Sequence, residues 1–152
     1  MPTIHLSINI QAPIQKVFDA ARSIDLHQTS MSHTCERAIA GKTDGLIALG
    51  ETVTWEAKHF GIMQKLTVKI THMEAPYTFI DEMVNGAFLS FEHTHSFEEN
   101  NGVTNMKDVF TYTSPLGAVG RVADFLFLKR YMTKLLIDRN NYLKEQLESL
   151  NR

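Results

Sequence analysis

The chain has 152 residues, of which 43% are apolar and 21% are charged, and its formal net charge is −2. This length suits a single domain that spans residues 1–152. The apolar content argues against disorder, and the small negative charge argues against electrostatic binding of nucleic acid.

Cysteine usage and the N-terminus indicate a cellular compartment. Cys35 is the single cysteine, which excludes an internal disulfide and a cysteine metal site. Residues Met1 to Ile10 alternate in polarity and do not resemble a signal peptide, and no stretch approaches the ~20 apolar residues of a membrane span. We therefore expect a cytoplasmic protein without stable membrane insertion.

The first predicted elements are a strand and a short helix. Apolar and polar residues alternate from Thr3 to Ile10, which is the period of a half-buried strand. Pro13 suits the first position of a helix. The predicted inner face of this helix has four apolar residues: Ile14, Val17, Phe18 and Ala21. The polar stretch 23–34 is interpreted as a loop or a broken helical turn.

A hairpin is predicted in the middle of the chain. Residues 35–40 indicate one strand of this region. Residues 52–59 and 62–72 indicate the two strands of the hairpin, with Phe60-Gly61 as a two-residue turn between them. That turn places Trp55 opposite Leu66, on the same face as Val68 and Gln64. The alternation agrees with this register, because the other face is polar.

The next connection leaves two alternatives. Residues 78–84 and 87–97 indicate strands joined at Asn85-Gly86. A two-residue turn would point Glu82 inward, whereas a three-residue turn with a glycine bulge would point Phe79 and Asp81 inward. We favour the bulged form, since Phe79 is a better lining residue than Glu82.

The turn at Asn101-Gly102 gives the sharpest prediction. With two turn residues, His95 faces Asp108 across neighbouring strands. The inner face of this hairpin then carries seven residues: Phe91, His93, His95, Met106, Asp108, Phe110 and Tyr112.

The pair of His95 and Asp108 supports several interpretations. A carboxylate can orient an imidazole so that it acts as a general base, which is the catalytic interpretation. No nucleophile motif accompanies the pair, so this pattern is weakly specific for catalysis. The structural interpretation is a buried pair that orients a pocket wall. A metal site with His93 as the second histidine is a further alternative, and the spacing is weakly specific. We favour the structural interpretation and predict neither a metal nor a cofactor.

The C-terminal part of the chain indicates one long amphipathic helix. After Ser114-Pro115, the region from Leu116 to Leu150 has a broad apolar face that includes Val122 and Leu126. One strand, a short helix, about six further strands and a terminal helix make an α+β arrangement. A bent sheet around one helix often leaves a cavity, and we expect one of about 300 Å³ or more.

The predicted cavity wall combines residues from the strands and the terminal helix. It consists of Trp55, Gln64, Leu66, Val68, Phe79, Asp81, Phe91, His93, His95, Met106, Asp108, Phe110, Tyr112, Val122 and Leu126.

Four segments resemble a known superfamily. They are residues 50–55 with His59-Phe60-Gly61, residues 79–82 with 86–88, residues 91–97, and residues 108–117. The chain resembles the SRPBCC or START-like superfamily of START lipid-transfer domains, polyketide cyclases and pollen-allergen-type proteins, and most closely its bacterial ligand-binding subgroup. The resemblance implies a helix-grip fold, in which a curved antiparallel sheet of six to seven strands surrounds a long C-terminal helix with a cavity between them.

Three functions compete. The leading hypothesis is binding or carrying of a small hydrophobic molecule, because the inner face is mostly apolar with a few convergent polar groups. The second is a cyclase or dehydratase that uses His95 and Asp108 for proton transfer. The third is an interaction module with a filled core. Superfamily labels alone do not decide among them, since one fold serves many functions.

Overall fold

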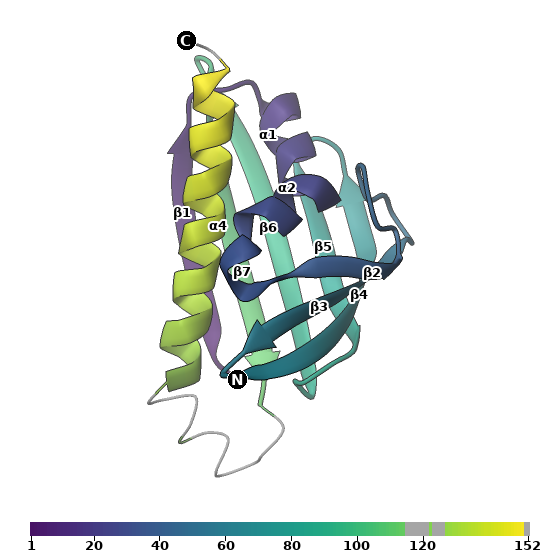
Figure 1. Ribbon diagram of the computed structural model, residues 1–152. Coiled ribbons are helices and arrows are strands. Elements are labelled where there is room, and N and C mark those ends of the chain that lie inside the picture. The colour runs from purple at the N-terminus through teal and green to yellow at the C-terminus, as the bar shows by residue number, and fades with distance from the viewer. Residues whose placement is uncertain (115–121, 123–126, 151–152) are drawn as a thin grey trace.

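Seven antiparallel strands form one curved sheet in the order β1-β7-β6-β5-β4-β3-β2 (Figure 1). The computed structural model describes residues 1–114, 122 and 127–150. The strands are β1 (Thr3–Ile10), β2 (Arg37–Gly41), β3 (Thr52–His59), β4 (Ile62–Glu74), β5 (Thr78–Asn85), β6 (Ser90–Asn100) and β7 (Val103–Thr113). The predicted α+β class and the antiparallel sheet are confirmed.

The helices lie together on the inner side of the sheet. They are α1 (Ile14–Ala21), α2 (Ile24–Ser30), the short 3-10 helix η1 (Ser32–Thr34) and α4 (Lys129–Ser149). Helix α4 contacts β1, α1 and α2, and Figure 1 shows it alongside β1. It accounts for the last part of the helix predicted from Leu116 to Leu150; of the earlier part, residues 116–121 and 123–126 lie outside the described residues.

Two hairpins have the predicted register. The turn residues Phe60 and Gly61 have φ angles of 53° and 77°, and Trp55 lies opposite Leu66. Asn101 and Gly102 have φ angles of 53° and 81°. Across β6 and β7, His95 pairs with Asp108 as predicted. The same register pairs Phe91 with Tyr112, His93 with Phe110, and Phe97 with Met106. Positive φ at both turn positions matches the right-handed twist of the strands.

The connection between β5 and β6 differs from both predicted turns. Strand β6 begins at Ser90 rather than at Ala87, so four residues join the strands, and Glu82 pairs with Glu92. Neither Asn85 nor Gly86 has the positive φ that a two-residue turn of this kind requires. The longer connection nevertheless points Phe79 and Asp81 inward, which is the orientation of the favoured alternative.

The segment interpreted as a loop or broken turn is helical. The Ser23 hydroxyl caps α2, since its Oγ accepts a hydrogen bond from the Leu26 N–H at 3.2 Å. A second short turn, η1, follows directly. These elements bring His27 and Met31 to the inner side of the sheet, where they line a pocket.

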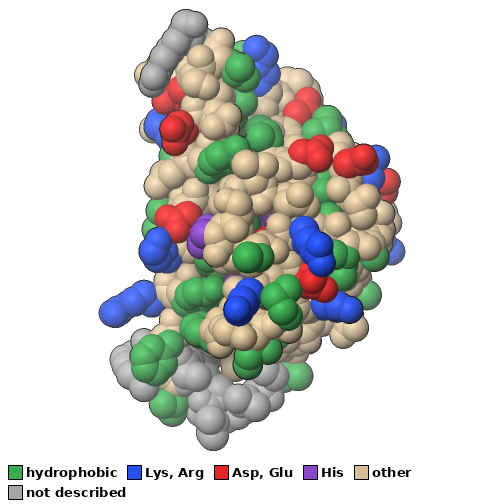
Figure 2. All heavy atoms as spheres, in the orientation of Figure 1, with side chains coloured by type: hydrophobic (Ala, Val, Ile, Leu, Met, Phe, Trp, Pro, Cys, Tyr) green, Lys and Arg blue, Asp and Glu red, His purple; other side chains and the backbone are tan. Residues whose placement is uncertain are grey.

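The surface that carries the helices is mixed in charge. Figure 2 shows Lys and Arg side chains interspersed with Asp and Glu over this face, without a large patch of one sign. Among the described residues, no helix combines the length and apolar character that crossing a membrane would require.

Candidate functional site

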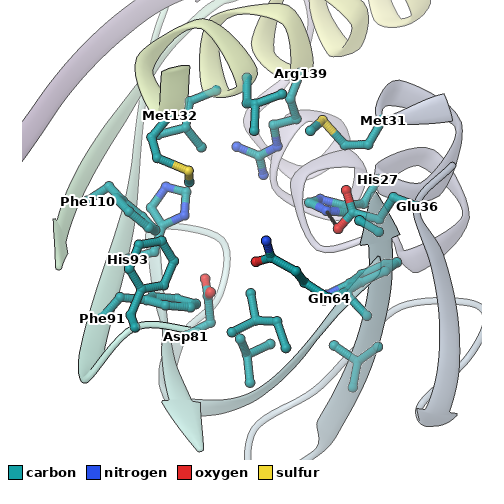
Figure 3. A pocket seen from close by; sticks show the side chains of 18 of the residues that line it. His27, Met31, Glu36, Gln64, Asp81, Phe91, His93, Phe110, Met132 and Arg139 are labelled. Atoms are coloured by element: carbon teal, nitrogen blue, oxygen red, sulfur yellow. Dashed lines mark hydrogen bonds and ion pairs between the residues drawn. The ribbon is translucent and has the colours of Figure 1, made fainter. Parts of the chain in front are cut away.

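A pocket lies between the inner face of the sheet and the helices α2 and α4 (Figure 3). Its volume is about 220 Å³, which is smaller than the sequence predicted. Side chains from α2 and α4 close the side that faces the sheet. Its wall includes these predicted residues: Trp55, Gln64, Leu66, Val68, Phe79, Asp81, Phe91, His93, His95 and Phe110.

Four of the predicted pocket residues that the structure describes are not on this wall. Met106, Asp108 and Tyr112 are almost fully buried on the inner face of β7 and are not among the residues that line the pocket. Asn140 of α4 contacts Asp108, and the Phe88 ring packs against Tyr112. Val122 is 60% exposed, so its predicted place in the wall is corrected. Leu126 lies outside the described residues.

The predicted histidine and aspartate face each other, but the hydrogen bonds run diagonally. His93 Nε2 lies 2.8 Å from Asp108 Oδ1, and His95 Nε2 lies 2.8 Å from Asp81 Oδ1. His95 Nδ1 is also 3.2 Å from Asp108 Oδ1, and this contact is not aligned as a hydrogen bond. Diagonal neighbours in a sheet remain within reach of long side chains, so both carboxylates serve one stacked pair of imidazoles.

Two residues of α4 complete the partners of Asp108, and the sequence did not single them out. Arg139 Nη1 donates to Asp108 Oδ1 at 3.3 Å, and Asn140 Nδ2 donates to Asp108 Oδ2 at 2.7 Å. Arg139 also donates to the Ala21 carbonyl at 3.1 Å. Both residues are only 4% exposed. They follow Leu135 and Leu136 by four positions, which places them on the same face of the helix. This spacing could have indicated from sequence that both residues face the interior.

The pKa values of His93 and His95 are shifted in opposite directions. Burial lowers the pKa of His93, and repulsion from His95 adds to this effect, despite the neighbouring Asp108. Burial also disfavours charge on His95, but its contacts with Asp108 and Asp81 outweigh burial and raise its pKa. The rings are stacked with centroids 3.8 Å apart, which strongly disfavours two positive charges. The surroundings therefore favour protonation of His95 over protonation of His93.

The tautomer of His93 follows from its partner. Although burial opposes ionisation, contacts with His93 and His95 hold the pKa of Asp108 well below its usual range. An ionised carboxylate only accepts hydrogen bonds, so His93 Nε2 carries the hydrogen and donates it to Asp108. In the neutral ring, Nδ1 is then an acceptor. It has no hydrogen-bond partner among the described residues, and His93 lines the pocket.

A second polar group lies on the wall formed by α2, β3 and Glu36, the residue that precedes β2. His27 Nε2 is 3.2 Å from Glu36 Oε1, and the His27 ring lies 4.4 Å from the Trp55 ring, centroid to centroid. In Figure 3 the Gln64 amide and the Asp81 carboxylate point into the space between this group and His93. The pocket therefore has polar side chains at two separated places on an apolar wall.

One trio of side chains could hold a metal ion. Ligand atoms of Asp81, His93 and His95 lie within 4.8 Å of one another. This set has the composition of a two-histidine, one-carboxylate site. The metal site considered from sequence had Asp108 as its carboxylate, whereas the structure brings Asp81 to the two histidines. The hydrogen bond between His95 and Asp81 already occupies part of this space, so a metal would have to displace a proton.

We expect acid to remove the stabilisation that these carboxylates provide. The pKa values of Asp81 and Asp108 are lowered, by hydrogen bonds and opposite charges that outweigh burial, so their ionisation stabilises the fold above the ordinary value of ~3.9. That contribution is lost as the pH falls through the lowered folded-state pKa values. Urea unfolding between pH 6 and pH 2.5 should show a steeper loss for the wild type than for Asp108→Asn; equal slopes would contradict this assignment.

The comparisons with known proteins bear on the fold. No protein-family model matches the chain, and no curated protein matches its sequence. Solved structures do match, for example a protein from Thermus thermophilus at TM-score 0.80 and 15% identity, covering 99% of this chain and 100% of that one. A START superfamily protein from Mycobacterium smegmatis matches at TM-score 0.73 and 11% identity, covering 97% and 98%.

A plant protein shares the architecture. The major latex-like protein 151 of Panax ginseng matches at TM-score 0.66 and 11% identity, with 96% of this chain and 97% of that one covered. Identities this low show the fold and nothing finer. The chain thus has the START-like helix-grip fold, as its sequence segments predicted.

Proposed function

We propose that this chain binds a small hydrophobic molecule in the pocket between the sheet and α4. The supporting observation is the pocket itself, whose largely apolar wall carries polar side chains at a few places. Small-molecule sites usually have this composition, because apolar area supplies affinity and a few polar groups fix orientation. A volume of about 220 Å³ lies below the ~300–1,000 Å³ common for drug-sized ligands, so we expect a compact ligand.

Trp55→Ala should weaken binding of a compact apolar probe such as 4-ethylanisole by at least about tenfold. Trp55 is the single tryptophan, and its side chain, 7% exposed overall, lines the pocket. Removing this ring deletes apolar contact area that a bound probe would bury. Isothermal titration calorimetry measures the effect, with circular dichroism to verify that the variant is folded.

The matched control for this test is Tyr77→Ala. Tyr77 is 62% exposed and is not among the residues that line the pocket, so its removal should leave the affinity unchanged. Equal affinities of the wild type and Trp55→Ala would argue that the probe binds elsewhere.

The alternative function, proton transfer by His95 and Asp108, has less support. Both ring nitrogens of His95 face carboxylates, at 2.8 Å and 3.2 Å, so neither is open to a ligand. Asp108 is 1% exposed and is not among the residues that line the pocket. An enzyme built on this cluster would have to use His93 instead, and a loss of any activity on replacing His93, with probe binding retained, would support it.

A further inference from the structure

We propose that the pocket selects neutral ligands that carry a hydroxyl group, and that this hydroxyl donates its hydrogen bond to His93 Nδ1. The inference rests on the proposed function and names the chemical class of its ligand: a compact apolar body with one alcohol or phenol. The hydroxyl binds without losing its proton.

The acceptor is held in place from behind. His93 Nε2 donates to Asp108 Oδ1 at 2.8 Å, and Asp108 is itself fixed by Arg139 and Asn140 of α4. The His93 side chain is 8% exposed and lines the pocket. Because Asp108 accepts from Nε2, the other nitrogen of the neutral ring presents a lone pair. An acceptor on a pocket-lining residue that has no partner among the described residues of the protein favours a ligand that brings a donor.

The stacked His95 explains why His93 accepts a hydrogen bond but does not take the proton. The two ring centroids are 3.8 Å apart, and His95 Nε2 already donates to Asp81. A proton moved from the ligand to His93 would place two imidazolium rings face to face beside the Arg139 guanidinium. This repulsion makes His93 a weak base, so the site favours binding over proton abstraction.

The charges around His93 favour a neutral ligand. Asp81 of β5 and Asp108 of β7 are balanced by His95 of β6 and Arg139 of α4, which leaves no net charge at this end of the pocket. Across the pocket, Glu36 faces His27. A carboxylate ligand would meet Asp81 without an unmatched cation, and Arg139 is already engaged by Asp108, Asn140 and Ala21.

Nitrogen NMR tests the acceptor without any ligand. In the ¹⁵N-labelled chain at pH 7, we expect His93 as the neutral tautomer with hydrogen on Nε2, and His95 with hydrogen on both nitrogens. His93 with hydrogen on Nδ1, or with both nitrogens protonated, would overturn the inference whatever the ligand results are.

Three matched probes test the ligand class by calorimetry. We expect 4-ethylphenol to bind about tenfold more tightly than its methyl ether, 4-ethylanisole, and 4-ethylbenzoate to bind most weakly. His93→Phe keeps an aromatic ring but removes the acceptor, so it should abolish the preference for the phenol while retaining binding of the ether. His72→Phe is the matched control, because the His72 side chain is 47% exposed and is not among the residues that line the pocket, so the preference should stay intact.

The outcomes separate this inference from the proposed function. If the ether binds as tightly as the phenol, or if the benzoate binds most tightly, the hydroxyl inference is wrong and the binding function stands. If none of the three probes binds, both are wrong. A preference for the phenol that survives in His93→Phe would also overturn the assignment of His93.

Discussion

Replacing Asp108 with Ala should lower the free energy of unfolding by about 3–5 kcal/mol, since it removes one partner of a buried ion pair. Asp108 is 1% exposed and contacts His93, Arg139 and Asn140. Without it, the guanidinium of Arg139, a residue only 4% exposed, loses its carboxylate and His93 loses its acceptor. Urea unfolding at pH 7 measures the change.

Asp138→Ala is the matched control for this substitution. The Asp138 side chain is 35% exposed and pairs with Lys134 one helical turn earlier. Such surface pairs contribute about 0–1 kcal/mol, so the control should lose little stability. A loss below about 1 kcal/mol for Asp108→Ala as well would show that the buried network is not a unit.

Phe18→Ala should cost a similar amount, about 3–5 kcal/mol, because it opens a cavity in the core. The Phe18 ring is 0% exposed and packs edge-on against Phe79 and Phe97, at centroid distances of 5.5 Å and 5.4 Å. This contact joins α1 to the sheet and supports Phe79, which lines the pocket. Thermal and urea unfolding would both report the loss.

The exposed phenylalanine Phe127 provides a control of the same residue type. Its side chain is 67% exposed, so Phe127→Ala should change the unfolding free energy by no more than about 0.5 kcal/mol. Comparable losses in the two variants would mean that Phe18 does not anchor α1 as the structure indicates.

Local rules explain why much of the sheet could be predicted from sequence. Phe60-Gly61 and Asn101-Gly102 each set a two-residue turn, and side-chain alternation admits one register for each hairpin. The same turn chemistry was misleading at Asn85-Gly86, where the strands are joined by a longer connection. The Asn-Gly dipeptide indicates that a two-residue turn is possible. The pairing of β5 with both neighbouring strands determines which connection forms.

The candidate site was predictable on the sheet and largely missed on the helices. The strand register predicted that His95 faces Asp108. The hydrogen bonds instead join His93 to Asp108 and His95 to Asp81. Register alone does not predict these partners, because they depend on the length and direction of the side chains. Arg139 was assigned no role, since a charged residue on a helix is usually solvated. Its burial depends on a carboxylate that β7 supplies from 31 positions earlier in the chain.

The most direct test of the central claim is to locate a bound probe. In isotope-filtered NMR of the ¹³C-labelled chain with unlabelled 4-ethylanisole, we expect intermolecular nuclear Overhauser effects from the probe to Trp55 and Phe110, which lie on the pocket wall. Effects confined to exposed side chains outside that wall, such as Leu89, which is 64% exposed, would contradict a binding function for this pocket. So would the absence of any intermolecular effect at probe concentrations that saturate the calorimetric signal.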